Sequence, residues 1–133
     1  MRHRVSGKKL SREEGHRRAL RRNLMIALFT HEEIITTEAK AQAIRGEAEH
    51  LITKAKRAIA SGNESAGVHA RRIIFSRLGN NREAMAKVYD VLAPRFMERP
   101  GGYTRCFKVE PRKGDNAPMV LLQLLPADDA ATK

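Results

Sequence analysis

The chain has 133 residues, a length that suits one domain with a modest core. Hydrophobic residues make up 41% and charged residues 31%, which excludes a wholly disordered chain and leaves little material for a large core. Twenty-six Lys and Arg against fifteen Asp and Glu give a formal net charge of +11, so we expect a polyanionic partner, either nucleic acid or an anionic membrane surface.

The positive charge is concentrated at the beginning of the chain. Residues 1–22 hold nine basic and two acidic residues, hence +7, and the remaining 111 residues contribute only +4. We expect residues 1–10 to form a basic, extended N-terminal arm that follows phosphate backbones. A solvated, disordered tail is the alternative. Arg outnumbers Lys seven to two in this region, and the planar guanidinium suits bidentate phosphate contact.

A first helix is predicted from Ser11 to about Phe29. Ser11 as N-cap with Glu14 three residues later forms a capping box. The cationic first half of this helix is expected to face a partner, whereas its second half enters the core. The predicted buried stripe consists of Ala19, Leu20, Leu24, Ala27 and Leu28.

Residues 33–37 are β-branched and predict a strand, after which Thr37 caps a second helix that Ser61-Gly62-Asn63 ends. Its expected core positions are Ile44, Ala48, Leu51, Ile52, Ala55 and Ile59. A third helix around 65–77 is expected to bury Val68, Ile74 and Phe75. A fourth begins with Asn80 and Glu83, carries Met85, Val88, Val91 and Leu92, and must end before Pro94.

The pattern changes after Arg95. Residues 104–110 and 118–125 predict two strands of a hairpin, with Gly114-Asp115-Asn116 in the turn. Residues 126–133 show no packing signal and predict a flexible C-terminal tail. The chain is therefore expected to be one α+β domain over residues 11–125, with three or four helices packed on a small mixed sheet of about three strands.

No catalytic or metal-binding constellation is present in the sequence. The five histidines lack the i+3 or i+4 spacing of metal ligands, and the adjacent carboxylates Glu13-Glu14 and Glu32-Glu33 point in different directions. The single cysteine, Cys106, excludes an internal disulfide and is expected to lie in the core. We predict no enzyme, no metal and no cofactor. No run of apolar residues reaches the length of an export signal or of a membrane span, so we expect a cytoplasmic protein.

Standard RNA-reading modules are also missing, and aromatic residues make up only 5%. Phosphate contact by Arg and Lys remains, which fixes position rather than reading bases. Engagement of six to nine phosphates predicts a log–log salt slope of roughly −4 to −8. A basic DNA-compacting protein is the alternative from another class. A membrane surface is disfavoured because the basic helix lacks an apolar anchoring face.

Three blocks of residues carry a resemblance to a known family. The first runs from Met1-Arg2-His3-Arg4 to Arg22-Asn23, the second from Ile35-Thr36-Thr37 to Lys56, and the third from Leu92 to Met119 with Arg99-Pro100-Gly101-Gly102-Tyr103-Thr104-Arg105 at its centre. Over residues 1–125 the chain resembles the bacterial large-subunit ribosomal protein seventeen family. Residues 61–70 match loosely and are expected to form a variable loop.

The resemblance implies an α+β protein of the large ribosomal subunit that binds 23S ribosomal RNA near the peptide exit, beside other ribosomal proteins. Its implied RNA contacts are Arg2, His3, Arg4, Lys8, Lys9, Arg12, His16, Arg17, Arg18, Arg21, Arg22, Asn23, Thr36, Thr37, Lys40, Arg45, Arg95, Arg99, Gly101, Gly102, Tyr103, Thr104 and Arg105.

Several of these residues keep two interpretations. Gly101-Gly102 either lets RNA approach the backbone closely or forms an ordinary turn. Tyr103 either stacks on a base or packs on the sheet. Arg71 and Arg72, on the predicted third helix, are expected to form a solvated face, with RNA or a neighbouring protein as the alternative.

Overall fold

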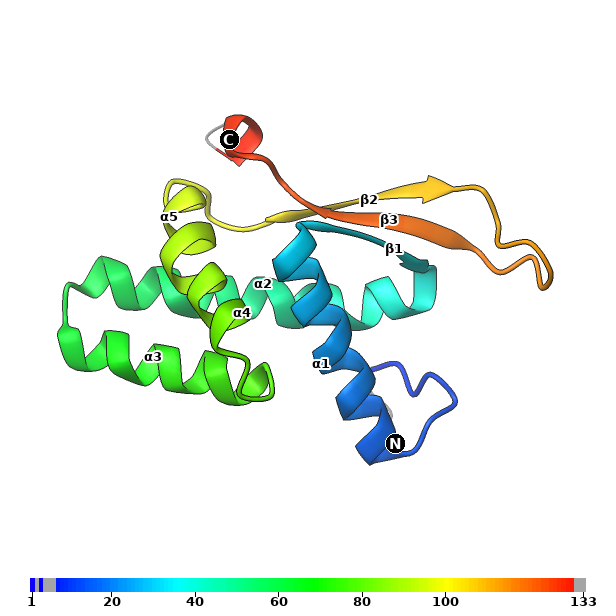
Figure 1. Cartoon of the computed structure of the whole chain (residues 1–133), viewed down its shortest axis with the longest axis horizontal. Coiled ribbons are helices and arrows are strands. Elements are labelled where there is room, and N and C mark those ends of the chain that lie inside the picture. The colour runs from blue at the N-terminus through cyan, green and yellow to red at the C-terminus, as the bar shows by residue number, and fades with distance from the viewer. Residues whose placement is uncertain (2, 4–6, 131–133) are drawn as a thin grey trace.

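The computed structural model describes residues 1, 3 and 7–130 of the chain. The predicted RNA contacts Arg2 and Arg4 lie outside the described residues. A three-stranded sheet carries the helical layer on one side, and the hairpin of two of its strands extends beyond the helices (Figure 1). The α+β prediction is confirmed.

Helix α1 spans Glu14–His31 and begins later than the sequence indicated. The predicted capping box is wrong, because Ser11 has a left-handed φ of 51° and the N-cap is Glu13, whose side chain makes no capping bond. The buried residues of α1 are Met25, Leu28 and Phe29, near its C-terminal end. Ala19, which was expected in the buried stripe, is exposed, so the cationic part of the helix is longer than predicted.

Strand β1 covers Glu33–Thr37, and α2 covers Glu38–Ser61. Both agree with the prediction, as does Gly62 at the left-handed C-cap. Thr37 occupies the predicted N-cap position, but its side chain makes no capping hydrogen bond. Of the predicted core positions, Ile59 is partly buried and the others are fully buried: Ile44, Ala48, Leu51, Ile52 and Ala55. Helix α2 packs against both α1 and α3 and so connects these two helices.

Helix α3 spans Glu64–Arg77, and the side chain of Asn63 caps it by accepting a hydrogen bond from the Ser65 N–H at 3.0 Å. The expected variable loop at residues 61–70 is therefore mostly helix. Val68 is 40% exposed rather than buried, and the contact face consists of Gly67, Ala70 and Ile74. Small residues at two of these positions bring α3 close to its neighbours.

The next helical segment runs through Pro94, contrary to the prediction. It consists of α4 (Arg82–Ala86), the π-helical turn η1 (Lys87–Leu92) and α5 (Ala93–Arg95). In η1 the Ala93 N–H donates to the Val88 carbonyl five residues earlier. The wider turn relieves the clash that a proline ring makes with the preceding helical turn, so the helix continues.

Two further details of this segment differ from the prediction. The N-cap of α4 is Asn81, whose side chain accepts from the Ala84 N–H at 2.9 Å, whereas Asn80 has a left-handed φ of 62°. Val91 is 44% exposed, because the extra residue of the π-turn rotates it off the apolar stripe that Val88 and Leu92 occupy.

The hairpin consists of β2 (Thr104–Val109) and β3 (Met119–Leu124), and the sheet order is β1-β3-β2. All neighbours are antiparallel, so the sheet is not mixed as predicted. Helix α2 packs on β1 and β3 and leaves most of the edge strand β2 uncovered. For this reason Cys106 is exposed, and the expectation of a core cysteine is wrong.

The described part of the predicted C-terminal tail contains one short helix. Ala127–Ala130 form one helical turn, α6, and Asp129 accepts a hydrogen bond from Arg105 at 3.0 Å. At the other end of the hairpin, bonds from Arg112 lower the pKa of Asp115 to about 2. The division into arm, domain and tail stays a prediction.

Candidate nucleic-acid interface

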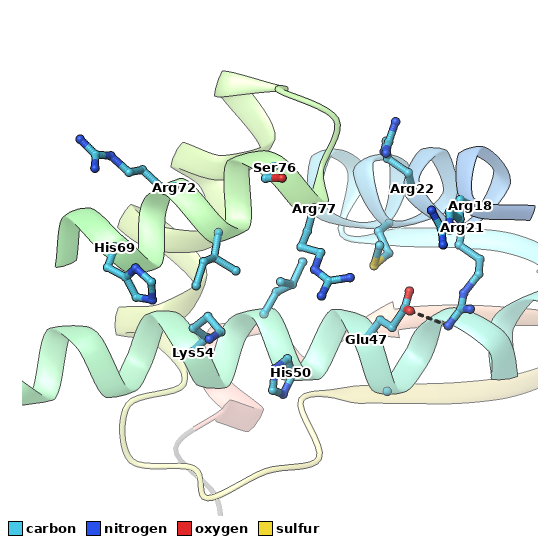
Figure 2. A pocket seen from close by; sticks show the side chains of 14 residues that line it. Arg18, Arg21, Arg22, Glu47, His50, Lys54, His69, Arg72, Ser76 and Arg77 are labelled. Carbon is cyan, nitrogen blue, oxygen red and sulfur yellow. Dashed lines mark hydrogen bonds and ion pairs between the residues drawn. The ribbon is translucent and has the colours of Figure 1, made fainter. Parts of the chain in front are cut away.

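A groove of about 1340 Å³ lies between α1, α2 and α3. Figure 2 shows that the three helices each contribute basic side chains to it. Its lining residues are Arg18, Arg21, Arg22, Met25, Gly46, Glu47, His50, Leu51, Lys54, His69, Arg72, Ile73, Ser76 and Arg77.

Helical spacing explains how these residues come to one surface. Gly46, His50 and Lys54 follow one another at intervals of four along α2, and His69, Arg72 and Ser76 do so at three and four along α3. Both rows face the same groove because α2 and α3 pack side by side.

The charge of the groove is strongly positive. Six Lys or Arg side chains line it against one carboxylate, Glu47. Glu47 accepts a hydrogen bond from Arg21 at 2.5 Å, and Arg18 pairs with Glu14 outside the groove. Among the residues that the structure describes, no carboxylate lies within 4 Å of the remaining four cations, which are Arg22, Lys54, Arg72 and Arg77.

Arg22 lies at one edge of the groove, beside the turn that follows α3. Gly79, in that turn, has a left-handed φ of 65°, and a Cβ on it would clash with the Arg22 Cδ. The absence of a side chain at Gly79 therefore makes room for the arginine stem. The Arg22 guanidinium has no acidic partner in the described part of the chain.

Sequence reasoning found only part of this groove. It predicted Arg18, Arg21 and Arg22 as RNA contacts and treated Arg72 as a solvated face, and it did not consider five of the groove's residues as contacts: His50, Lys54, His69, Ser76 and Arg77. For His50 and Lys54, the signal that would have identified them is their i, i+4 spacing on α2, opposite its apolar stripe.

The N-terminal arm and the first turns of α1 supply further exposed polar groups. His3, Lys8, Lys9, His16 and Asn23 are exposed, so each is accessible to a partner. Arg12 and Arg17 are half-buried, and their guanidinium groups donate to the carbonyls of Leu10 and Arg12 at 2.8 and 3.3 Å. These hydrogen bonds use some of the donors of both arginines and connect the end of the arm to the start of α1.

The cluster predicted around the start of α2 is only partly accessible. Thr36 is 7% exposed and points to the helical layer, which is at odds with direct RNA contact. Thr37 and Lys40 are half-buried. Arg45 donates from its Nε to the Thr104 Oγ1 at 3.0 Å, so its guanidinium connects α2 to β2.

The Arg95 side chain is only 15% exposed and pairs with a carboxylate of the same chain. It makes a bidentate ion pair with Glu32, at 2.7 and 2.9 Å, and the Lys87 Nζ lies 2.8 Å from the same carboxylate. Hydrogen bonds from Arg95 lower the pKa of Glu32 to about 2; burial opposes this shift and Lys87 adds to it. The pKa of Arg95 is raised by the same contact. These ion pairs connect η1 and α5 to the junction of α1 and β1.

The glycine loop and the start of β2 also serve the fold. Tyr103 is fully buried against Phe96, with ring centroids 5.0 Å apart, and the Lys56 Nζ donates to its hydroxyl at 2.9 Å. Thr104 is 4% exposed and donates to Glu49 at 2.6 Å. Base stacking by Tyr103 and RNA contact by Thr104 do not fit this burial.

The arginines that flank the loop bond to groups of the protein. Arg99 donates from its Nε to the carbonyls of Gly101 and Gly102, both at 3.1 Å, which supports an ordinary turn. Arg105 donates to Gln123 at 2.8 Å and to Asp129 at 3.0 Å. Both arginines therefore hold the ends of the sheet and the helical turn after it.

Residues 1, 3 and 7–130 contain neither a candidate metal site nor a helix suited to cross a membrane. Within those residues no group of three or more His, Cys, Asp or Glu side chains is arranged to hold a metal ion. In the same part of the chain, none of the helices combines the length and the apolar character needed to cross a membrane.

Comparison with known proteins gives one family. A model of the family described as ribosomal protein L17 matches residues 20–125. A protein of Thermomicrobium roseum is 42% identical over 125 residues, which cover 94% of this chain and 99% of that protein. Relatives in Pelobacter propionicus and Syntrophotalea carbinolica are 42% and 40% identical over the same share of this chain, covering 91% and 75% of their own lengths. All three are named large ribosomal subunit protein bL17.

Proposed function

Because the chain belongs to the ribosomal protein L17 family, we propose that it is a structural constituent of the large ribosomal subunit and works in translation in the cytoplasm. We further propose that it binds 23S ribosomal RNA mainly through phosphate contacts, near the peptide exit and beside neighbouring ribosomal proteins. The relatives named as large-subunit proteins cover nearly the whole chain, which supports the first part.

The groove carries the second part of the proposal. It presents four cations that lack an acidic partner among the described residues, and a phosphate backbone offers the acceptors that such side chains need. Two histidines are the only ring-bearing side chains in its lining, so stacking on bases has a small role there. Contact of this kind fixes the position of a folded RNA whose shape provides the specificity.

The proposed contact set therefore shifts from the glycine loop to the helices. It keeps the accessible residues of the arm and of α1 and adds the groove residues Lys54, Arg72 and Arg77. It leaves out Thr36, Arg95, Tyr103 and Thr104, because burial or internal ion pairing already uses them. No catalytic step is proposed.

Filter binding to 23S ribosomal RNA over a salt series tests the groove. The variant combines Arg22→Gln, Arg72→Gln and Arg77→Gln. Loss of three phosphate contacts is expected to weaken binding on the order of 10- to 100-fold and to make the log–log salt slope less negative by about 2 to 3.

A matched control removes the same charge from exposed cations elsewhere, with Arg57→Gln, Arg82→Gln and Lys113→Gln. Its slope is expected to change by less than about 1. Equal changes in both variants would contradict a groove-centred interface. Duplex DNA bound as tightly as ribosomal RNA at matched salt would instead favour a DNA-compacting protein.

A further inference from the structure

The face of the sheet that points away from the helices carries two apolar rows. Residues that pair across antiparallel strands share one face, and Ile35, Leu121 and Phe107 are paired in this way. The next row on the same face joins Thr37, Met119 and Val109. In Figure 1 the helices lie on the opposite side of the sheet.

These side chains are unusually exposed for their type. Ile35 is 65% exposed, Phe107 49% and Val109 38%. Three of the six large hydrophobic residues that are exposed in the described structure thus gather on this one face. Contiguous exposed apolar surface of this kind marks an interaction site more often than scattered single residues do.

The charges of this face are balanced within the protein. Its third row joins Glu33, Gln123 and Arg105, where Gln123 donates to Glu33 at 3.1 Å and accepts from Arg105 at 2.8 Å. Arg105 continues the chain of bonds to Asp129. One carboxylate and one guanidinium on a face of a +11 chain leave no surplus cation for a phosphate backbone.

We propose that this outer sheet face docks an apolar segment of another protein of the large subunit. The groove and the sheet face are therefore opposite in character: one has cations without acidic partners, and the other has apolar rows beside a neutralised polar row. The inference rests on the proposed membership of the large subunit and is independent of the RNA contacts in the groove.

A second copy of this chain fits the face less well. A contact that uses only five apolar side chains from each copy is small for a stable dimer, which buries roughly 1,200 Å² over both partners, and two +11 chains repel each other. Two proteins held side by side by the same RNA need a smaller contact, because their effective concentration is already high.

Photo-crosslinking within the particle tests the proposal. Phe107→p-benzoylphenylalanine places the probe in the centre of the face, and Val68→p-benzoylphenylalanine is the control on α3, where the side chain is 40% exposed. Large subunits are isolated from cells in high salt with magnesium, irradiated, and the adduct is identified by mass spectrometry. The expected result is one discrete adduct between the Phe107 probe and a large-subunit protein, which the Val68 probe does not give.

An adduct of the Phe107 probe with ribosomal RNA, an adduct between two copies of this chain, or no adduct would each overturn the proposal. Adding Ile35→Thr and Val109→Thr to the probe-bearing chain keeps β-propensity while removing apolar surface, and is expected to abolish the protein adduct. An adduct of undiminished yield in that variant would also overturn it. Failure of the groove proposal would appear as equal changes of the RNA salt slope in the groove variant and its control, and it would leave this adduct intact, so the two failures are distinguishable.

Discussion

Both the groove and the segment from Arg95 to Arg105 are rich in arginine, but the arginines of the two regions differ in their acidic partners. In the groove, Arg22, Arg72 and Arg77 have no carboxylate within 4 Å in the described part of the chain. In the segment, Arg95 pairs with Glu32 and Arg105 with Asp129. An arginine whose donors already bond within the protein has fewer of them left for RNA.

The difference follows from the elements that carry the two sets. The groove lies on a surface made by three helices, whose basic rows point away from the apolar stripes. The segment from Arg95 to Arg105 connects the helical layer to the sheet, where carbonyls and carboxylates of both layers need donors. Positive charge on a connecting segment therefore serves the stability of the fold before it serves RNA binding.

The largest effect on stability is expected from Arg95→Ala. It leaves the partly buried Glu32 carboxylate with Lys87 alone, and the free energy of unfolding is expected to fall by about 3 kcal/mol in urea denaturation. At temperatures where the variant is folded, the RNA salt slope stays unchanged. Arg72→Ala, as the control, is expected to leave unfolding within about 0.5 kcal/mol of the parent. A stable Arg95→Ala protein with a reduced slope would reverse the roles of the two regions.

Gly67→Ala is expected to have the next largest effect, through the α3 wall of the groove. A Cβ at Gly67 would lie 2.8 Å from the Tyr89 hydroxyl, so α3 must move or the ring must shift. Overpacking of this kind costs about 1 to 3 kcal/mol, measured by urea denaturation. Gly46→Ala on α2 is the control: nothing lies within 4 Å of its Cβ, and the change is expected to stabilise by about 0.5 to 1 kcal/mol.

The free energy of unfolding, measured as the pH is lowered, tests how much the ionised Glu32 contributes to stability. Its pKa is lowered from 4.5 to about 2, so the ionised, paired form stabilises the protein above pH 4.5. That contribution is expected to decline as pH falls from 4.5 towards 2, by about 1 to 2 kcal/mol after allowance for partial exposure. Glu32→Gln is expected to flatten this part of the curve of unfolding free energy against pH. An identical acid slope in parent and variant would assign the loss to other carboxylates.

The smallest effect on stability is expected from Arg18→Ala. Its partner Glu14 is one turn away on the exposed face of α1, and exposed pairs at this spacing contribute about 0.3 to 0.5 kcal/mol. The same substitution is expected to make the RNA salt slope less negative by about 1, because Arg18 lines the groove. Measuring the free energy of unfolding and the RNA salt slope on this one variant separates the contribution of Arg18 to stability from its contribution to binding.

Local patterns in the sequence predicted the elements whose causes are local. The β-branched run at 33–37, the apolar stripe of α2 with its Gly62 end, and the hairpin around Gly114 were all correct, because spacing and turn chemistry determine them. The candidate site was harder. Whether Arg95 faces RNA or Glu32 depends on a partner 63 positions away, which no local pattern encodes.

Errors at single positions have similar causes. Val68 and Val91 are apolar at helical spacing, but the first lies on a face where Gly67 and Ala70 make the contact and the second follows an extra residue in the helix. The RNA contacts that the family resemblance implies at Tyr103 and Thr104 stay predictions. The burial of both side chains indicates that this part of the motif serves packing.

The π-turn η1 makes this helix one residue longer than a regular α-helix between the same two ends. Deleting an exposed residue of the turn, such as Asp90, would leave a regular α-helix between the same two ends. Lys87, at the start of the turn, and Arg95, beyond it, would therefore both keep facing Glu32. The chain should tolerate loss of this position better than loss of a residue from a regular part of the helix, which would turn everything beyond it by about 100° about the helix axis.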